Sequence, residues 1–275
     1  MNSYTMNRHI ISAIMIIALS PLAASCSNVI CNDTQQTLKT SNHDYQDSEK
    51  WGKVTAIKLP SRTFHEVELS GTVRMEYTQS KTCSIEVYGN EKAIDAYSIR
   101  VDDGELKVTY KENGNKEGTN TYNIPPVTIR IAAPYLSEIT GAGALEVVFM
   151  KGVEQEKELE VNLSGAGTIS IGAFKAPDLE MNISGAGKVT LGDVRLTGNA
   201  DLNVAGARTV AGKITSGKMR LELTGAVNGE LEIHAKQANV IVSGASHLIL
   251  SGKTDRLEQS SQGVSYIKTD NLKVG

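Results

Sequence analysis

The chain has 275 residues, 40% of them hydrophobic and 21% charged, which provides enough apolar side chains for a folded core and argues against wholesale disorder. Its formal net charge of −3 argues against a nucleic-acid binder that works by neutralising phosphates. The 25 glycines follow no Gly-X-Y period, so a collagen-like rod is excluded as well.

Residues 1–25 have the layout of a bacterial secretory signal. Arg8 and His9 precede an apolar run over residues 10–19, about half the length of a membrane span. The segment Leu-Ala-Ala-Ser-Cys that ends at Cys26 resembles a lipobox, in which the cysteine receives diacylglycerol and an N-acyl chain such as palmitate. More than one acyl chain is enough for stable membrane anchoring. The alternative is an ordinary cleaved signal in which the cysteine is incidental.

Residues 26–51 follow as a polar segment rich in Ser, Thr, Asn, Asp and Gln. Such a composition cannot bury enough apolar surface to fold, so we interpret this segment as a disordered tether behind the lipidated cysteine. The remaining cysteines, Cys31 and Cys83, lie far apart and have no Cys-x-x-Cys spacing. They form no zinc motif, and we expect both to be unpaired or incidental.

Residues 52–135 alternate apolar and polar side chains with period two, which predicts a series of β-strands. One short helical piece is expected over residues 91–97, and Asp102-Asp103-Gly104 is typical of a hairpin turn. This N-terminal β region is expected to cap the repeats that follow or to continue them, because an open end of stacked strands is an aggregation-prone edge.

Residues 136–275 carry an internal repeat built on small-residue triplets such as Ser-Gly-Ala. The central glycines recur every 19 to 24 residues, at Gly141, Gly165, Gly185, Gly206, Gly225, Gly244 and Gly263. A period of about 20 residues with two short strands and a glycine corner is typical of one coil of a parallel β-solenoid. Leu159, Val161 and Leu163 are predicted to point inward, with their equivalents stacked on them. We expect each glycine at positive φ, with the alanine after it facing the interior.

Several segments together resemble a known family. They are residues 64–73, 101–108 and 127–136, followed by the serial Ser-Gly-Ala units. They are similar to the DUF2807 family, also called the auto-transporter adhesin head or GIN domain, over about residues 52–270. The resemblance implies an all-β fold, a right-handed single-stranded parallel β-helix, in a lipoprotein of the Bacteroidetes type. It supplies no catalytic residues.

The predicted register stacks polar side chains into rows on the outer face of the coils. These residues are Glu160, Glu180 and Asp201, with Asn162, Asn182 and Asn203 beside them. Successive strands lie about 4.8 Å apart, so neighbouring carboxylates have a separation that suits a retaining glycosidase, and the oxygens could bind Ca²⁺. The alternative is a solvated strand face without a ligand. No catalytic, cofactor-binding or metal-binding residue is assigned, and no cofactor is expected.

The aromatic side chains give one further indication. Six tyrosines lie in the N-terminal β region, namely Tyr77, Tyr88, Tyr97, Tyr110, Tyr122 and Tyr135. Tyrosine is favoured at recognition surfaces and can stack on sugars, so a binding site is expected in that region. The alternative is that these tyrosines fill strand positions with their hydroxyls outward.

The sequence therefore predicts a non-enzymatic, lipid-anchored protein of the cell envelope that binds a glycan or a protein and does not bind nucleic acid. We expect an outer-membrane lipoprotein attached through Cys26, on either the periplasmic or the cell-surface face. Two alternatives stay open: a β-helix carbohydrate-active enzyme, either a polysaccharide lyase or a glycosidase, and a purely structural envelope protein.

Overall fold

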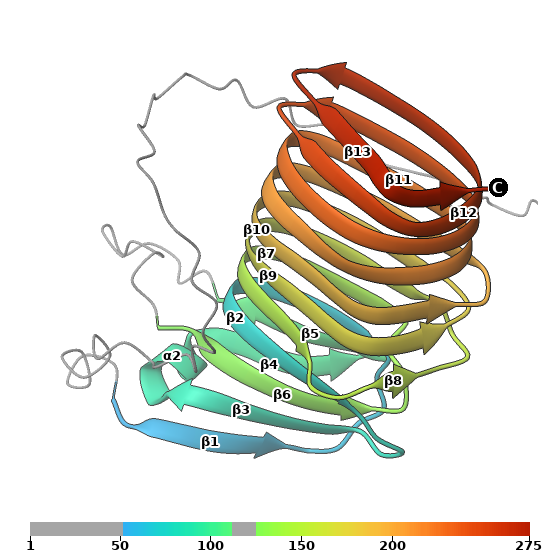
Figure 1. Ribbon diagram of the computed structural model, residues 1–275. Helices are drawn as coiled ribbons and strands as arrows, with labels where there is room; N and C mark the ends of the chain where they lie inside the picture. Colours follow the sequence, from blue (N-terminus) through green and yellow to red (C-terminus); the bar gives the residue numbers. More distant parts are fainter. Residues whose placement is uncertain (1–51, 112–124) are drawn as a thin grey trace, which may run out of the picture. The chain divides into compact units, whose positions relative to one another are not determined.

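The computed structural model describes residues 52–111 and 125–275, which form a stack of parallel coils with a group of shorter strands at one end (Figure 1). The predicted signal, Cys26, Cys31, the tether and Tyr122 lie outside the described residues. The boundaries proposed at residues 25, 51 and 135 remain predictions. Cys83 forms no disulfide with any of the described residues.

The N-terminal β region is built mostly from antiparallel strands. Its elements are β1 (Val54–Leu59), β3 (Ser84–Asn90), α2 (Glu91–Asp95), β4 (Tyr97–Asp102), β5 (Glu105–Tyr110) and β6 (Val127–Ala133). β3 lies between β1 and β6, and β4 pairs with β5. Asp103 and Gly104 both have positive φ in the β4–β5 turn, which confirms the predicted hairpin. α2 confirms the predicted helical piece.

β2 (Glu66–Gln79) joins this region to the coils. It pairs in parallel with β7 (Glu138–Phe149) along nearly its whole length, and on its other side it pairs with β5 and β6. β2 and β7 are neighbours in the sheet but far apart in the chain, because β3 to β6 are inserted between them. The N-terminal β region thus continues the sheet of the repeats and covers the edge of β2 that faces away from β7.

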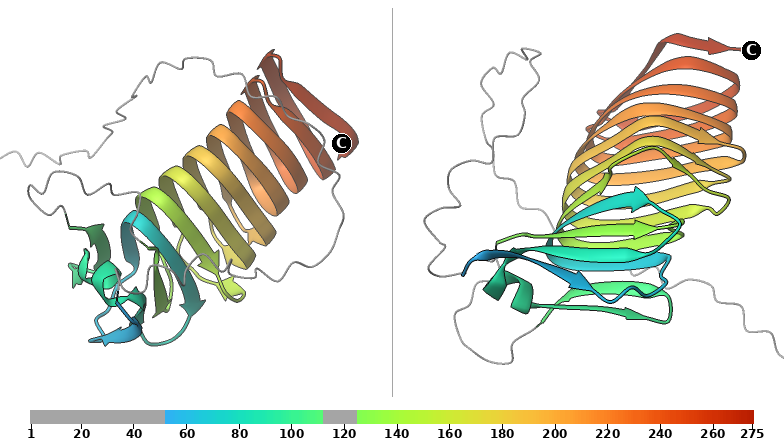
Figure 2. Two further views of the ribbon diagram at one scale, coloured as in Figure 1. Left: turned by 90° about the vertical axis from the view of Figure 1, so that its left-hand side faces the viewer. Right: turned by 90° about the horizontal axis from the view of Figure 1, so that it is seen from below.

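The repeats form a β-solenoid of about seven turns, as the sequence predicted. Its strands are β7, β8 (Val153–Glu154), β9 (Leu159–Ala176), β10 (Leu179–Leu196), β11 (Asn199–Gly244), β12 (His247–Gly263) and β13 (Tyr266–Val274). Each strand bends around the interior and pairs in parallel with its equivalent in the next coil, as the two views of Figure 2 show. β11 is long because it runs without interruption through more than two coils.

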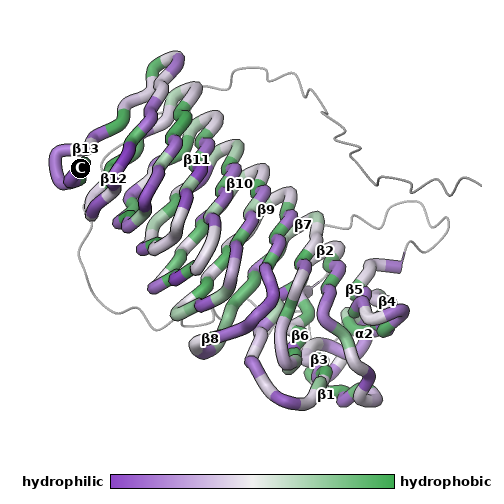
Figure 3. Tube along the Cα trace, turned by 90° about the vertical axis from the view of Figure 1, so that its right-hand side faces the viewer, coloured by the Kyte–Doolittle hydropathy of each residue, from purple (hydrophilic) through white to green (hydrophobic). Residues whose placement is uncertain are grey.

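The interior is a continuous aliphatic stack. Leu159, Val161 and Leu163 are at most 6% exposed, and their equivalents in the following coils are buried as well, which confirms the predicted inward positions. Fully burying one such side chain is worth about 1.5–3 kcal/mol. In β12 the pattern changes, because Gln259 and Ser261 occupy the positions that pair with Val240 and Val242. Figure 3 shows the alternation of hydrophobic and hydrophilic residues along the coils.

The corners of the coils are a column of glycines with φ between 82° and 129°. The column contains Gly71, Gly143, Gly165, Gly185, Gly206, Gly225, Gly244 and Gly263. A Cβ on Gly185 would overlap the carbonyl oxygen of Gly165, so both the backbone angle and the close stacking require glycine. Two expectations were wrong. Gly141 is not a corner, since it pairs with Leu163, and Gly143 takes its place. The alanines after the corner glycines are exposed, because the chain turns outward there.

One buried arginine reinforces these corners. Arg208 pairs with Gly187, which in turn pairs with Gly167. The two preceding coils therefore have a glycine, without a side chain, at the position equivalent to Arg208. The Arg208 guanidinium reaches back across them and donates to the carbonyl oxygens of Gly165, Gly167 and Ser184 at 2.8–3.3 Å. The residue is 5% exposed, and burial lowers its pKa. The Gly-Ala-Gly corner therefore presents its carbonyl groups to a buried cation.

Candidate functional site

The parallel register brings the predicted ladder residues together in two adjacent rows. The carboxylate row contains Glu160, Glu180 and Asp201, and the amide row contains Asn162, Asn182 and Asn203. Within the amide row, Asn182 Nδ2 donates to Asn162 Oδ1 at 2.9 Å, and Asn203 Nδ2 donates to Asn182 Oδ1 at 2.9 Å. Each amide also donates to the carboxylate of its own coil, at 2.6–3.1 Å. The polar groups of the two rows thus bond mainly to one another.

The carboxylate row is longer than the repeat pattern indicated. Glu138 pairs with Glu160 and with Glu66, and Glu66 pairs with Glu105, so the row extends into the N-terminal β region. Burial, together with the negative charges of Glu160, Glu66 and Glu105, raises the pKa of Glu138. Burial also raises the pKa of Asp201, and the neighbouring Arg220 opposes that shift. Stacking like charges about 4.8 Å apart therefore costs some stability.

This row borders a groove of about 410 Å³ whose charged lining is wholly acidic: Glu158, Glu160, Asp178, Glu180 and Asp201. No group of three or more His, Cys, Asp or Glu side chains in the described part of the chain has an arrangement that could hold a metal ion. The spacing of the carboxylates alone names neither a general acid nor a substrate pocket.

A larger groove, which we call the β8 groove, lies beside β8 and has a volume of about 760 Å³. Its lining is formed by Gln79, Pro134, Tyr135, residues 154–157, residues 175–177 and residues 195–197. The coil from Gly143 to Gly165 is longer than the coil from Gly165 to Gly185, because it has one extra residue on each side of β8. Residues 154–157, at the end of β8 and directly after it, form one wall of the groove.

Two glutamine side chains hold this wall in place. Gln155 is 8% exposed, and its Nε2 donates to the carbonyl oxygens of Leu136 at 2.8 Å and Lys157 at 2.9 Å. Gln79 Nε2 donates to the carbonyl oxygens of Pro134 and Glu154, at 2.8 and 2.7 Å, and its Oε1 accepts from the Glu154 amide. Because these bonds tie three segments together, the wall is organised before any ligand arrives.

The floor of the β8 groove combines one aromatic ring with apolar side chains. Tyr135 stacks on His65, with ring centroids 5.6 Å apart and an interplanar angle of 11°. His65 Nδ1 lies 3.2 Å from the Ser137 hydroxyl, which fixes the orientation of both rings. Pro134 and Pro177 lie in the same lining. A fixed aromatic face beside apolar surface can stack on a sugar ring or on an apolar side chain.

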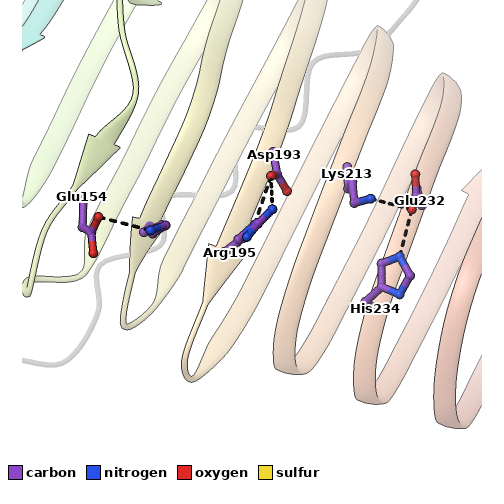
Figure 4. Close-up of polar contacts among 7 residues, drawn as sticks. Glu154, Asp193, Arg195, Lys213, Glu232 and His234 are labelled. Carbon is purple, nitrogen blue, oxygen red and sulfur yellow. Dashed lines mark hydrogen bonds and ion pairs between the residues drawn. The ribbon is translucent and has the colours of Figure 1, made fainter.

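Charged side chains on successive coils form an ion-pair ladder next to this groove (Figure 4). Its pairs are Lys175 with Glu154 at 3.2 Å, Arg195 with Asp193 at 2.7 Å, and Glu232 with both Lys213 and His234 at 2.8 and 2.9 Å. The hydrogen bond from Arg195 lowers the pKa of Asp193. Lys175, Arg195 and Glu154 also line the groove, where Lys157 forms no ion pair within the described residues. The rim therefore offers both positive and negative groups.

Two tyrosines of the N-terminal β region are buried in the core, and a third lines the β8 groove. Tyr77 and Tyr97 are at most 4% exposed, and their hydroxyls donate to the backbone carbonyls of Ala133 and Thr72, at 3.1 Å each. Burial raises the pKa of both. The hydroxyls of Tyr77 and Tyr97 therefore do not point outward, so the alternative stated for the tyrosines does not hold for these two. Of the tyrosines singled out from the sequence and described in the structure, Tyr135 is the one that lines the β8 groove.

Comparison of the sequence with known families shows the family to which this solenoid belongs. Residues 63–207 and 190–275 match the family described as "Putative auto-transporter adhesin, head GIN domain", as the resemblance implied. The chain belongs to this DUF2807 family. No curated protein matches the chain at a significant level. The family description suggests a binding protein of the cell envelope or surface.

Solved structures share the fold. A protein from Parabacteroides distasonis entitled a "putative lipid binding protein" is 20% identical, with a TM-score of 0.62, and the match covers 82% of this chain and 98% of that one. A "putative adhesin" from Bacteroides fragilis is 18% identical, with a TM-score of 0.56 and coverages of 79% and 97%. A "putative adhesin" from Parabacteroides merdae is 18% identical, with a TM-score of 0.52 and coverages of 79% and 96%. Across residues 52–111 and 125–275, no helix is long and apolar enough to span a membrane.

Proposed function

We propose that this protein is a non-enzymatic, lipid-anchored binding module of the cell envelope, and that the β8 groove binds a glycan or protein partner. The observation that carries the proposal is the preorganised groove itself. Tyr135 gives it a fixed aromatic face, and the two glutamines hold its wall. Lys157, Lys175 and Arg195 provide donors for hydroxyl or carboxylate groups on a ligand.

The two polar rows from Glu160 to Asp201 and from Asn162 to Asn203 are proposed as a secondary, solvated surface beside this site. Because the asparagine amides already donate within the rows, few donors remain for a ligand. Their carboxylates can still accept hydrogen bonds from sugar hydroxyls or from a basic partner.

The anchor is proposed on the cysteine motif at Cys26, which lies outside the described residues. In this arrangement the acyl chains hold the protein in the outer membrane and the polar tether separates the solenoid from the lipid surface. Replacing Cys26 by Ala is expected to move the protein from the membrane fraction to the soluble fraction. If the variant stays with the membranes, the anchoring proposal is wrong.

The groove is tested by comparing Tyr135→Ala with Tyr88→Ala on a glycan array and in binding assays with extracellular-matrix proteins. Tyr88 is a suitable control because it is a surface tyrosine outside the groove, with Arg130 over its ring at 4.3 Å. We expect Tyr135→Ala to weaken binding of any positive probe about tenfold or more, since loss of a stacked aromatic costs about 1–3 kcal/mol. Equal losses for the two variants would place the site elsewhere.

The proposal that the protein is not an enzyme is tested with the same glycans. Each bound polysaccharide is incubated with the protein, and released reducing ends and unsaturated uronic acids are measured. We expect no turnover above a blank without protein. Release that disappears in Glu180→Gln would instead support the carbohydrate-active alternative and assign a role to the carboxylate row.

A further inference from the structure

The edge of the solenoid where each coil passes into the next carries one row of side chains whose charge changes sign along the stack. This edge row contains Glu158, Asp178, Asn199, Lys218, Gln237 and Arg256, one residue from each of six successive coils. Its first two members are acidic, Asn199 is neutral, and the cations Lys218 and Arg256 follow with the neutral Gln237 between them. Asp178 is held in place because its Oδ1 accepts from the Asn199 amide at 2.6 Å.

The side chains beside the edge row repeat this polarity. The acidic half is the 410 Å³ groove described above, in which Glu160 and Glu180 add to the negative charge. The other half consists of two grooves of about 420 and 620 Å³, where Arg220 and Lys236 add positive charge. Asp201, Asp255 and Glu258 also line these two grooves, so their four cations exceed their acidic groups by one.

Many of these charges have no counter-ion within the molecule. In the described part of the chain, no lysine or arginine nitrogen lies within 4 Å of the carboxylates of Glu158, Asp178 or Glu180, and no carboxylate lies within 4 Å of the amino groups of Lys218 or Lys236. Arg220 and Arg256 at this edge are paired, with Glu222 and Glu258. The charges that stay without a counter-ion are therefore acidic on one half of the edge and basic on the other.

We propose that this edge is a self-complementary surface on which a second copy of the chain docks in antiparallel orientation. A two-fold axis beside Asn199 places Asp178 of each copy opposite Lys218 of the other, one coil from the axis. Two coils from the axis, Glu158 meets Gln237 with Lys236 beside it. Because the coils rise in equal steps of about 4.8 Å, the two edge rows stay in step over these two levels on each side of the axis. The two N-terminal β regions lie at opposite ends of such a pair.

The pairing goes beyond the proposed function, since the edge row and the β8 groove share no lining residue. The contact is narrow and polar, which is typical of a transient interface rather than of an obligate one. Its strength should come from complementary charge, so it should fall steeply with salt concentration.

The experiment measures binding between an immobilised full chain and a second full chain in the same detergent by biolayer interferometry. One double variant, Lys218→Glu/Lys236→Glu, makes the edge more acidic, and the other, Glu158→Lys/Asp178→Lys, makes it more basic. A matched control, Lys151→Glu/Lys188→Glu, reverses two exposed lysines away from this edge.

We expect the unmodified chain to bind itself, with a Kd that rises about tenfold or more between about 50 and 300 mM NaCl. Each edge variant should bind itself at least about tenfold more weakly, while the control variant keeps the original Kd. Mixing the acidic-edge with the basic-edge variant should restore binding, which also shows that both variants are folded. The proposal is overturned if the mixture binds no more tightly than either variant alone, or if the unmodified chain shows no salt-dependent self-association at concentrations up to about 1 mM.

Discussion

In the coils from β9 to β12, each strand pairs in parallel with its equivalent in the neighbouring coil, and aliphatic residues recur at the inward positions up to the end of β11. In the N-terminal β region, most pairs are antiparallel, no unit is repeated, and the buried aromatic side chains of Phe64, Tyr77 and Tyr97 pack among the aliphatic ones. Both regions close the same hydrophobic interior, one by repetition and the other by individual contacts.

The difference shows where each region is sensitive to change. In the coils, an error in backbone geometry at one level is passed to the levels on both sides, because each corner rests directly on the next. In the N-terminal β region, stability depends on single side chains that bridge distant segments, such as Tyr97, whose hydroxyl contacts both the amide and the carbonyl of Thr72.

The largest effect is expected at the corner column. Gly185→Ala forces an alanine to a φ of 101° and places its Cβ against the Gly165 carbonyl, so we expect a loss of about 3 kcal/mol or more in the free energy of unfolding. The matched control is Gly172→Ala, because a Cβ there has nothing within 4 Å. Urea denaturation of both variants measures the difference. Similar stabilities would mean that the corners do not constrain the stack.

The N-terminal β region should be most sensitive at a buried hydroxyl. Tyr97→Phe leaves the Thr72 amide and carbonyl without the partner that they have at 2.9 and 3.1 Å, so we expect a loss of about 1–2 kcal/mol. Tyr88→Phe removes a hydroxyl that bonds to Glu86 on the surface and should cost much less. Thermal unfolding followed by circular dichroism compares the two. An equal loss would argue against specific bridging by Tyr97.

A smaller effect of opposite sign is expected where the two regions meet. The pKa of Glu138 is raised, so its ionised form destabilises the folded protein at neutral pH, and stability is gained as the pH falls through that raised pKa. Glu138→Gln should therefore stabilise the protein at pH 7 by about 0.5 kcal/mol, a small amount because solvent screens the partly exposed carboxyl. The gain should vanish below the ordinary value of 4.5, where both states are protonated. A gain that persists at acid pH would exclude charge repulsion as its cause.

The smallest effect is expected in the ion-pair ladder. Lys213 and His234 lower the pKa of Glu232, so any contribution of this carboxylate is present at neutral pH and is lost as the pH falls through its lowered pKa. Because the group is solvent-exposed, Glu232→Gln should leave the midpoint of thermal unfolding unchanged within error. A clear drop at pH 7 that is absent at pH 3 would show that the ladder stabilises the coils after all.

The coils could be predicted from the sequence because one local rule is repeated, and the period is visible without knowledge of any long-range contact. The first corner was assigned wrongly because Gly141-Ala142-Gly143-Ala144 offers two glycines in alternate positions. A shift from one to the other leaves every side chain on the same face, so the inward pattern could not distinguish them. Gly71 was missed because the strands from β3 to β6 separate it in the chain from its stacking partner Gly143.

The candidate sites differ in the same way. The two polar rows follow from the register, and Asn162, Asn182 and Asn203 meet as predicted. The β8 groove depends instead on a departure from the repeat and on contacts among Gln79, Tyr135 and Gln155, which come from three separate segments. The unusual spacing around the first coil was the available signal, but spacing alone does not show which side chains line the resulting hollow.

The position of β1 at the edge of the sheet has a mechanical consequence. A pull on the chain from its N-terminal side enters the described fold at β1. Among the described strands β1 pairs with β3 alone, along one edge, and its Val54 is 76% exposed. By contrast, β9 and β10 are joined along nearly their whole length and are bounded by further coils on both sides. Under tension β1 should therefore peel away first, lengthening the chain slightly while the coils and the β8 groove keep their shape.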